Sequence, residues 1–368
     1  MLKKCFIVLT FIVGTTHCFA QNILKPGFNP KEYADLLSLT FYKSSIPDSV
    51  KRLTAVDPYK QVYRSPEMGL LNLWSLYLRN DNVGVIDLRG TVSNMVSWME
   101  NFYAAAIPAT GSLQLNDTTT FNYKFANNPN AQVHVGWAFA IGFLGPDVVA
   151  KINQYYKSNG TKDFFISGHS QGGALANLMR SYLEYETQKG NLPKDIVYKT
   201  YSSAAPKVGN MYYAYDFDFL TRGDWAFTIV NAADWVPESP FSVQTLSDFN
   251  YSNPFPGLKK TIKKQKLLPR LVLGGMYKKL DKSTVKAQKR LEKYLGKRLY
   301  KMVKKQHPQY KQPVYAGGNN YMRSGVPIVL MPSEAYMKKF PDSRETPFVH
   351  HMFTSYSFLL NEIYFSNK

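Results

Sequence analysis

Cysteine is almost absent from this chain of 368 residues. Its two cysteines, Cys5 and Cys18, both lie within the first 20 residues. A chain that loses this segment has no disulfide, no thiol nucleophile and no cysteine-bound metal. The sequence also lacks a His-Glu-x-x-His zinc motif and internal repeats at solenoid periods. We therefore expect neither a metal nor another cofactor.

The apolar run near the N-terminus is too short to span a bilayer. Two lysines precede an apolar run at 5–13, and a break at Gly14 and the small residue Ala20 follow. A run of nine residues is about half of what a membrane-spanning helix needs. The pattern predicts a signal peptide, residues 1–20, cleaved near Ala20. We therefore expect an exported protein, whether secreted, periplasmic or held at the cell surface.

Acidic residues are scarce in one segment, and that segment carries nearly all of the net charge of +19. Between Lys259 and Lys311 there are 19 Lys and Arg residues against only two acidic ones. A basic amphipathic helix within it, from Ser283 to Val303, could lie on an anionic membrane or lipid surface. It could equally be a packed helix whose lysines face solvent. No nucleic-acid motif accompanies the charge, so no nucleic acid is expected as a partner. The residues on the apolar face of this helix are Val285, Gln288, Leu291, Leu295, Leu299 and Met302.

Short apolar segments alternate with helical patterns along the rest of the chain. Such alternation predicts an α/β fold with a mainly parallel central sheet flanked by helices. The predicted strands are 83–88, 163–167, 196–201 and 226–230, and the predicted helices begin at Pro30, at Pro146, after Ser170 and at Met352.

A serine between two glycines stands where a predicted strand gives way to a helix. Residues 168–172 read Gly-His-Ser-Gln-Gly, and small helix-forming residues follow them. This is the pattern of a nucleophile elbow, in which flanking glycines permit a strained turn that exposes the serine hydroxyl. The alternative interpretation is a glycine-rich turn whose serine caps the helix.

A serine nucleophile needs a base and a group that orients this base. The histidines that follow Ser170 are His307, His350 and His351. His307 lies inside the basic segment and is the poorest candidate, whereas the adjacent pair precedes a terminal apolar helix. One of the pair is therefore expected to be the base.

For the acid, Asp234 is favoured because it follows the predicted strand 226–230; the rivals are Asp224 and Glu238.

The oxyanion that forms when the serine attacks an ester also needs hydrogen-bond donors. The backbone N–H of Gln171 supplies one, and Thr91, after strand 83–88, is placed to supply a second through its N–H and hydroxyl.

Five segments in a fixed order carry a family resemblance. The segment 87–91 looks like an oxyanion segment. The segment 133–137 resembles a Val-His-x-Gly-Phe signature, with Trp in place of Phe. The segment 168–176 resembles the motif Gly-His-Ser-Leu-Gly-Gly-Ala-Leu-Ala around a nucleophilic serine, with Gln171 where Leu is usual. The segments 205–210 and 231–237 complete the set. Together they resemble the class 3 lipases, the fungal-type triacylglycerol lipases and their bacterial relatives.

The resemblance implies an α/β-hydrolase fold with the triad Ser170, Asp234 and His351. His351 is preferred to His350 because the family often shows a Tyr five residues later, here Tyr356. The interval between the implied Asp and His is much longer than is usual in the family, and the concentration of charge and the helical pattern predict a basic, largely helical insertion, 255–312, within it. The hydrolase domain would then comprise 21–254 and 313–368.

The implied function is a secreted serine ester hydrolase that cleaves acyl esters of lipids, with Thr91 and Gln171 as the oxyanion hole. The apolar stretch 99–107 is a candidate lid, or otherwise an ordinary buried helix. His134 and His169 are interpreted as structural. Two alternatives stay open: a phospholipase A1 acting at anionic membranes through Lys259–Lys311, and a non-catalytic surface- or polyanion-binding protein on a hydrolase fold.

Overall fold

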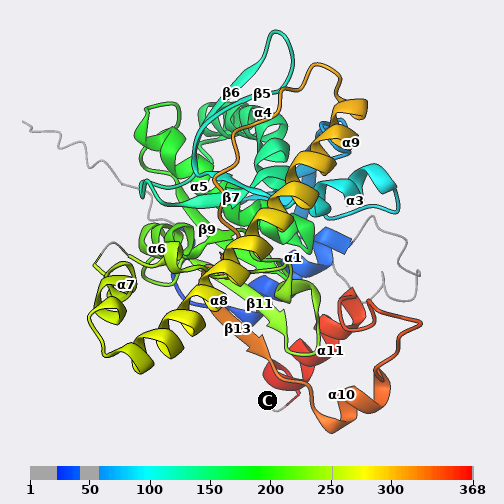
Figure 1. Cartoon of the computed structure of the whole chain (residues 1–368). Helices are drawn as coiled ribbons and strands as arrows, with labels where there is room; N and C mark the ends of the chain where they lie inside the picture. The colour runs from blue at the N-terminus through cyan, green and yellow to red at the C-terminus, as the bar shows by residue number, and fades with distance from the viewer. Residues whose placement is uncertain (1–22, 42–57, 251, 367–368) are drawn as a thin grey trace, which may run out of the picture.

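A computed structural model describes residues 23–41, 58–250 and 252–366, so the predicted signal peptide lies outside the described residues. A seven-stranded sheet in the order β1-β2-β3-β8-β9-β11-β13 forms the centre, with helices packed around it (Figure 1). The strands from β3 to β13 are mutually parallel, and β1 and β2 join them antiparallel. The predicted α/β fold with a mainly parallel, helix-flanked sheet is confirmed. The strands of this sheet are β1 (Tyr59–Arg64), β2 (Trp74–Arg79), β3 (Gly84–Leu88), β8 (Asp163–His169), β9 (Val197–Ser203), β11 (Ala226–Asn231) and β13 (Val326–Leu330).

The central strands β3, β8, β9 and β11 match the four predicted strands. Continuous apolar runs are typical of strands that are buried on both faces, and β3 and β8 are buried at every position. The edge strand β13 was not predicted although its five residues are apolar, because Pro327 interrupts the strand pattern.

Helices cover both faces of the sheet. On one face α1 and α11 pack around Tyr33, Phe227 and Tyr356, and on the other α4 and α5 pack around Phe164 and Leu175. The helices are α1 (Pro30–Phe41), α3 (Met95–Phe102), α4 (Val135–Asn159), α5 (Gln171–Gln188), α6 (Met211–Leu220), α7 (Phe255–Lys263), α8 (Leu267–Leu291), α9 (Leu299–Gln306), α10 (Glu334–Lys339) and α11 (Phe353–Tyr364), with 3-10 turns η1 (Val236–Glu238) and η2 (Leu246–Asp248) and the π-helical η3 (Glu292–Arg298).

Helix α4 begins well before the residue predicted for it, Pro146. It starts at Val135 because the side chain of His134 caps it, with Nδ1 accepting a 3.3 Å hydrogen bond from the backbone N–H of Trp137. Gly160, at φ 67°, ends it. This helix is long and apolar enough to cross a membrane, but 67% of its most apolar window is buried inside the protein, as expected of a core helix.

Smaller sheets lie beside the central one. A four-stranded sheet has the order β12-β10-β7-β4, and β5 and β6 form a separate hairpin. Their strands are β4 (Ala106–Pro108), β5 (Thr110–Gln114), β6 (Thr120–Lys124), β7 (Gln132–His134), β10 (Gly209–Asn210) and β12 (Tyr321–Met322).

The basic segment forms α7, α8, η3 and α9, and α8 runs diagonally across the face of the molecule shown in Figure 1. The C-terminal part of the basic segment, η3 and α9, packs on the rest of the protein. The carbonyl of Leu295 accepts a hydrogen bond from the backbone N–H of Ala105, and Val303 is fully buried. The predicted apolar face is half-buried at Val285 and Leu291. From Leu295 onward the segment is therefore packed on the protein, which agrees for this part with the second of the two interpretations left open by the sequence.

Candidate active site

Ser170 occupies a strained turn between β8 and α5. Its φ of 61° and ψ of −128° lie in a region that residues with a side chain seldom adopt. Its backbone N–H is anchored by a 2.9 Å hydrogen bond to the carbonyl of Ser203. The flanking glycines are required for space: a Cβ at Gly172 would lie 2.1 Å from the carbonyl oxygen of Leu88, and one at Gly168 would lie 2.4 Å from Gly172. The turn thus holds the serine at the carboxyl end of a central strand.

Asp234 and His351 form a buried pair at the same end of the sheet. His351 Nδ1 lies 2.7 Å from Asp234 Oδ2. The carboxylate also accepts hydrogen bonds from the hydroxyl of Tyr356 (2.9 Å) and from the backbone N–H of Val236 (3.0 Å). These donors fix the carboxylate, which in turn orients the imidazole.

The other two candidate histidines have different partners. His350 Nδ1 pairs with the hydroxyl of Tyr336, and its Nε2 lies 3.0 Å from Asp342 Oδ1. His307 pairs through Nε2 with the backbone carbonyl of Gly69. Of the three histidines after the serine, His351 is the one that contacts Asp234.

Neither rival carboxylate forms an ion pair with one of these histidines. Asp224 sits in a turn at φ 64°, where its backbone carbonyl accepts a hydrogen bond from Gly27. Glu238 is at the end of η1. Across the described residues, no group of three or more His, Cys, Asp or Glu side chains could hold a metal ion.

His134 and His169 serve the framework around this pair. His169 Nδ1 pairs with the hydroxyl of Ser203 (2.9 Å), and its Nε2 pairs with the backbone carbonyl of His351 (2.7 Å), which holds that residue in place. His134 Nε2 pairs with the carbonyl of Asn101. Burial lowers the pKa of His134 to about 3 and that of His169 well below its usual value. Both rings are therefore neutral near pH 7.

The loop after β3 lies against the serine turn. A Cβ at Gly90 would lie 3.7 Å from the Cβ of Ser170. Thr91 Oγ1 donates a hydrogen bond to Gln171 Oε1 (3.1 Å) and accepts one from Asn101 Nδ2 (2.8 Å). A hydroxyl has one proton, and Thr91 already donates this proton to Gln171. The backbone N–H of Thr91 is therefore the group that could donate to an oxyanion.

Glu100 was not predicted from the sequence, yet it lies one hydrogen bond from the residue after the serine. Gln171 Nε2 donates to Glu100 Oε1 over 2.7 Å. The carboxyl group is fully buried, and burial raises its pKa to about 8, against the opposing effect of hydrogen bonding. One signal pointed to this pair: glutamine stands at 171 where the resembled motif usually has leucine.

Most of the candidate lid, 99–107, is buried. Tyr103 to Ile107 are nearly inaccessible and run into β4, and Met99 is buried. The exposed apolar side chains of this region lie on α3, where Met95 is 70% and Phe102 is 52% exposed. The stretch is therefore mainly core, although its second half is not helical.

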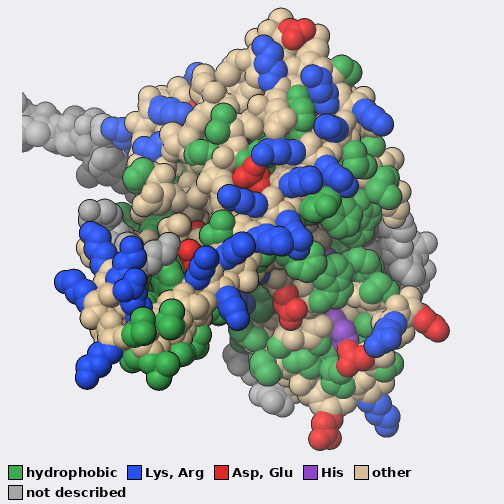
Figure 2. Space-filling view, in the orientation of Figure 1, with side chains coloured by type: hydrophobic (Ala, Val, Ile, Leu, Met, Phe, Trp, Pro, Cys, Tyr) green, Lys and Arg blue, Asp and Glu red, His purple; other side chains and the backbone are tan. Residues whose placement is uncertain are grey.

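Aromatic side chains surround the His351 loop. The ring of Phe348 lies 5.7 Å from that of Trp98, 5.4 Å from that of Trp235 and 6.0 Å from that of His351. Trp235 and Met352 are exposed. Figure 2 shows hydrophobic side chains around a histidine on the same face that α8 crosses. Exposed apolar side chains therefore lie beside the His351 loop.

A strained serine thus stands at the carboxyl end of a central parallel strand, and a buried Asp-His pair lies at the same end of the sheet. Residues 85–244 match the family model described as lipase (class 3). This part of the chain is therefore similar to the class 3 lipases, the family that its motifs resemble.

The chain is also similar to individual lipases. It is 27% identical over 169 residues to secreted mono- and diacylglycerol lipase 1 of Fusarium solani, covering 45% of this chain and 42% of that protein. It is 31% identical over 147 residues to the secreted mono- and diacylglycerol lipase LIP1 of Malassezia globosa, covering 37% and 46%. The chain thus spans less than half the length of these relatives. The Rhizomucor miehei triacylglyceride lipase structure is 18% identical, with a TM-score of 0.41, over 59% of this chain and 77% of that one.

Proposed function

We propose that this protein is a serine ester hydrolase that cleaves acyl esters of lipids, with Ser170, Asp234 and His351 as its catalytic triad. One observation carries the proposal: the strained Ser170 shares the carboxyl edge of the sheet with His351, whose Nδ1 is 2.7 Å from Asp234. These are the nucleophile, base and orienting acid that acyl transfer requires.

The hydrogen bond to Asp234 determines the part played by each nitrogen of His351. With Nδ1–H donating to the carboxylate, Nε2 is left unprotonated and basic. Nε2 would accept the proton of Ser170 as its Oγ attacks the ester carbonyl, and would then return it to the leaving alcohol. Water would cleave the acyl-enzyme by the reverse use of the same groups, while Asp234 stabilises the imidazolium that forms in each half-reaction.

The oxyanion would be held by two backbone donors, the N–H groups of Gln171 and Thr91. Gln171 begins α5, and the first N–H groups of a helix have no intrahelical acceptor. Each such donor contributes about 3 kcal/mol of transition-state stabilisation. The side chains of both residues would act indirectly, by holding the loop after β3 against the serine turn.

Mono- and diacylglycerols are the substrates named for the similar Fusarium and Malassezia proteins, and we propose a lipid acyl ester for this chain. The exposed apolar side chains of α3 and of the His351 loop support this proposal, because an acyl chain needs apolar surface at the mouth of the site.

We further propose a signal peptide at 1–20, export of the remainder, and a hydrolase unit formed by 21–254 and 313–368. Residues 255–312 would be an insertion between Asp234 and His351. The sheet supports this division, since β11, before the insertion, pairs in parallel with β13, which follows it.

A phospholipase A1 is the second candidate function. It is favoured by the cationic segment Lys259–Lys311, which could hold the enzyme at an anionic membrane. A non-catalytic binding protein on the same fold remains the alternative from another class, and absence of turnover would favour it.

Hydrolysis of nitrophenyl esters of graded chain length by residues 21–368, beside the Ser170→Ala variant, tests the proposal. We expect turnover by the wild-type protein and its loss, about 10⁴-fold or more, in the variant. Diacylglycerol and phosphatidylglycerol assayed in parallel would separate the two candidate substrates. Folded protein without turnover on any ester would refute the enzymatic proposal.

A further inference from the structure

The first half of α8 exposes an unusual amount of apolar side chain. Here α8 packs on α7, where Ile262 lies close to Gly274. The apolar side chains that remain outside this contact are between 45% and 75% exposed. Patches of this kind mark interaction sites on soluble proteins. The exposed residues are Leu267, Leu268, Leu271, Val272, Leu273, Met276 and Leu280.

The charge around this patch has one sign. Residues 255–280 contain eight Lys and Arg residues and no Asp or Glu. Figure 2 shows these features together: hydrophobic side chains gather on the lobe formed by α7 and the start of α8, with Lys and Arg side chains around them. A partner for this surface must therefore offer both apolar material and negative charge.

The charge continues along the same face of α8. With 3.6 residues per turn, spacings of 4, 7, 4 and 7 place Leu267, Leu271, Lys278, Lys282 and Lys289 on one side of the helix. This face therefore passes from apolar at its N-terminal end to cationic at its C-terminal end.

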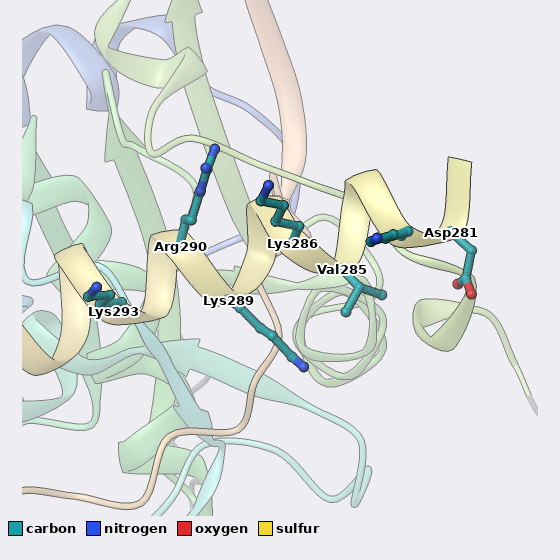
Figure 3. A pocket seen from close by; sticks show the side chains of 7 residues that line it. Asp281, Val285, Lys286, Lys289, Arg290 and Lys293 are labelled. Atoms are coloured by element: carbon teal, nitrogen blue, oxygen red, sulfur yellow. The ribbon is translucent and has the colours of Figure 1, made fainter. Parts of the chain in front are cut away.

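The cationic end borders an open groove of about 600 Å³ along the helix. Figure 3 shows Lys286, Lys289 and Arg290 projecting outward from α8 there. The groove is lined by Asp281, Lys282, Val285, Lys286, Lys289, Arg290 and Lys293. It offers several cationic groups close together, which suits the phosphates of lipid headgroups better than a single anion.

We propose that α7 and α8 dock the protein on an anionic phospholipid bilayer. The apolar end of α8, around Leu268 and Leu271, enters the acyl region, and the lysines from Lys278 to Lys293 contact the phosphates. This inference rests on the proposed function, since it names the surface that presents the lipid ester to the site. It also moves the expected membrane-facing part toward the N-terminus, from the predicted helix 283–303 to residues 255–293.

A bilayer fits this surface better than the other occupants. A second copy would bring two strongly cationic faces together, which is electrostatically unfavourable. A soluble polyanion would satisfy the lysines but leave the apolar end in water. A bilayer of anionic lipid satisfies both halves, in the manner of interfacial amphipathic helices.

Vesicle flotation of the full mature chain carrying Ser170→Ala tests the docking without any turnover. The probes are vesicles of phosphatidylcholine alone and of phosphatidylcholine with 30% phosphatidylglycerol. Two α8 variants are compared: Lys282→Gln/Lys286→Gln/Lys289→Gln and Leu267→Gln/Leu271→Gln. Matched controls remove three exposed lysines elsewhere (Lys157→Gln/Lys194→Gln/Lys338→Gln) and two exposed apolar side chains elsewhere (Val314→Gln/Met331→Gln).

We expect salt-sensitive binding to the phosphatidylglycerol vesicles and weak binding to phosphatidylcholine alone. The lysine variant should lose about a hundredfold in affinity, on the basis of about 1 kcal/mol per lysine at an anionic surface. The leucine variant should lose binding at every salt concentration, and both controls should bind like the parent.

Equal binding to both vesicle types, or equal losses in the α8 lysine variant and its control, would overturn the docking. So would a concentration-dependent dimer in light scattering that the leucine variant abolishes, because a second copy would then cover this face. The same α8 substitutions, made in the protein that keeps Ser170, are also assayed for hydrolysis of a short soluble ester. This assay tests the enzymatic proposal separately from the docking proposal. Turnover without docking, or docking without turnover, would each refute one and leave the other standing.

Discussion

Gln171, which follows the proposed nucleophile, donates a 2.7 Å hydrogen bond to the buried carboxyl group of Glu100, and it accepts another from Thr91. The loop after β3, the serine turn and α3 are thereby joined by side chains. Because burial raises the pKa of Glu100 to about 8, this link contains a carboxyl group that is neutral at pH 7, and its ionisation can be tested.

Glu100→Gln is expected to change how stability depends on pH. The folded protein holds the Glu100 proton up to about pH 8, whereas the unfolded chain releases it near pH 4.5. Between these values the folded state binds one more proton, so this group lowers the free energy of unfolding as pH rises. Glutamine keeps an oxygen for Gln171 and does not ionise.

The measurement is urea unfolding of both proteins at pH 5 and pH 8. Relative to Glu100→Gln, the wild type should lose about 1.4 kcal/mol per pH unit within the window. Other titrating groups, including Asp87 and His134, are common to both proteins and cancel. Parallel pH profiles would show that Glu100 is ionised throughout.

Thr91→Val tests whether the Thr91 hydroxyl touches the oxyanion. Since the structure engages this hydroxyl with Gln171 and Asn101, its removal should lower kcat/KM for a short ester by less than about tenfold. Loss of a direct oxyanion donor costs on the order of 100-fold or more in kcat. Thr91→Ser, which keeps the hydroxyl, is the control and should resemble the wild type. If Thr91→Val instead lowered activity by about 100-fold or more, the hydroxyl would be a direct donor to the oxyanion.

Gly172→Ala should prevent the serine turn from closing. An added Cβ would lie 2.1 Å from the Leu88 carbonyl oxygen, which is backbone and cannot move aside easily. We expect a loss of about 3 kcal/mol or more in the free energy of unfolding. Gly275→Ala, in α8, meets no atom within 4 Å and should be neutral or stabilising by up to about 1 kcal/mol. Thermal and urea unfolding of the two variants compare them directly.

The two adjacent histidines give a paired prediction. His351→Gln removes the partner of Asp234 and should lower kcat by about 10⁴-fold. His350→Gln removes contacts to Tyr336 and Asp342, so activity should remain within about tenfold of the wild type. Circular dichroism confirms folding of both. If His350→Gln proved to be the inactive variant, the assignment of the base would be reversed.

Local patterns predicted the elements that build the edge of the site. The buried strands β3, β8, β9 and β11 carry continuous apolar runs, and the glycines around Ser170 mark a turn whose backbone tolerates no side chain. Both signals lie within about ten residues of chain, so they could be recognised without the fold. Strand β13 was not predicted although it is apolar, because Pro327 interrupts its strand pattern. The stretch 99–107 was ambiguous because its apolar composition suits a lid as well as a buried core segment.

The sequence by itself determined the α/β class, the serine turn and the concentration of charge in one segment, since each depends on residue types at short spacing. Tertiary structure decided which histidine meets Asp234, that Glu100 lies against Gln171, and that α8 is packed at one end and exposed at the other. Those outcomes depend on contacts between residues about 70 to 120 positions apart or on how a helix meets a distant surface. No local periodicity encodes such contacts, because only the folded chain brings these groups together.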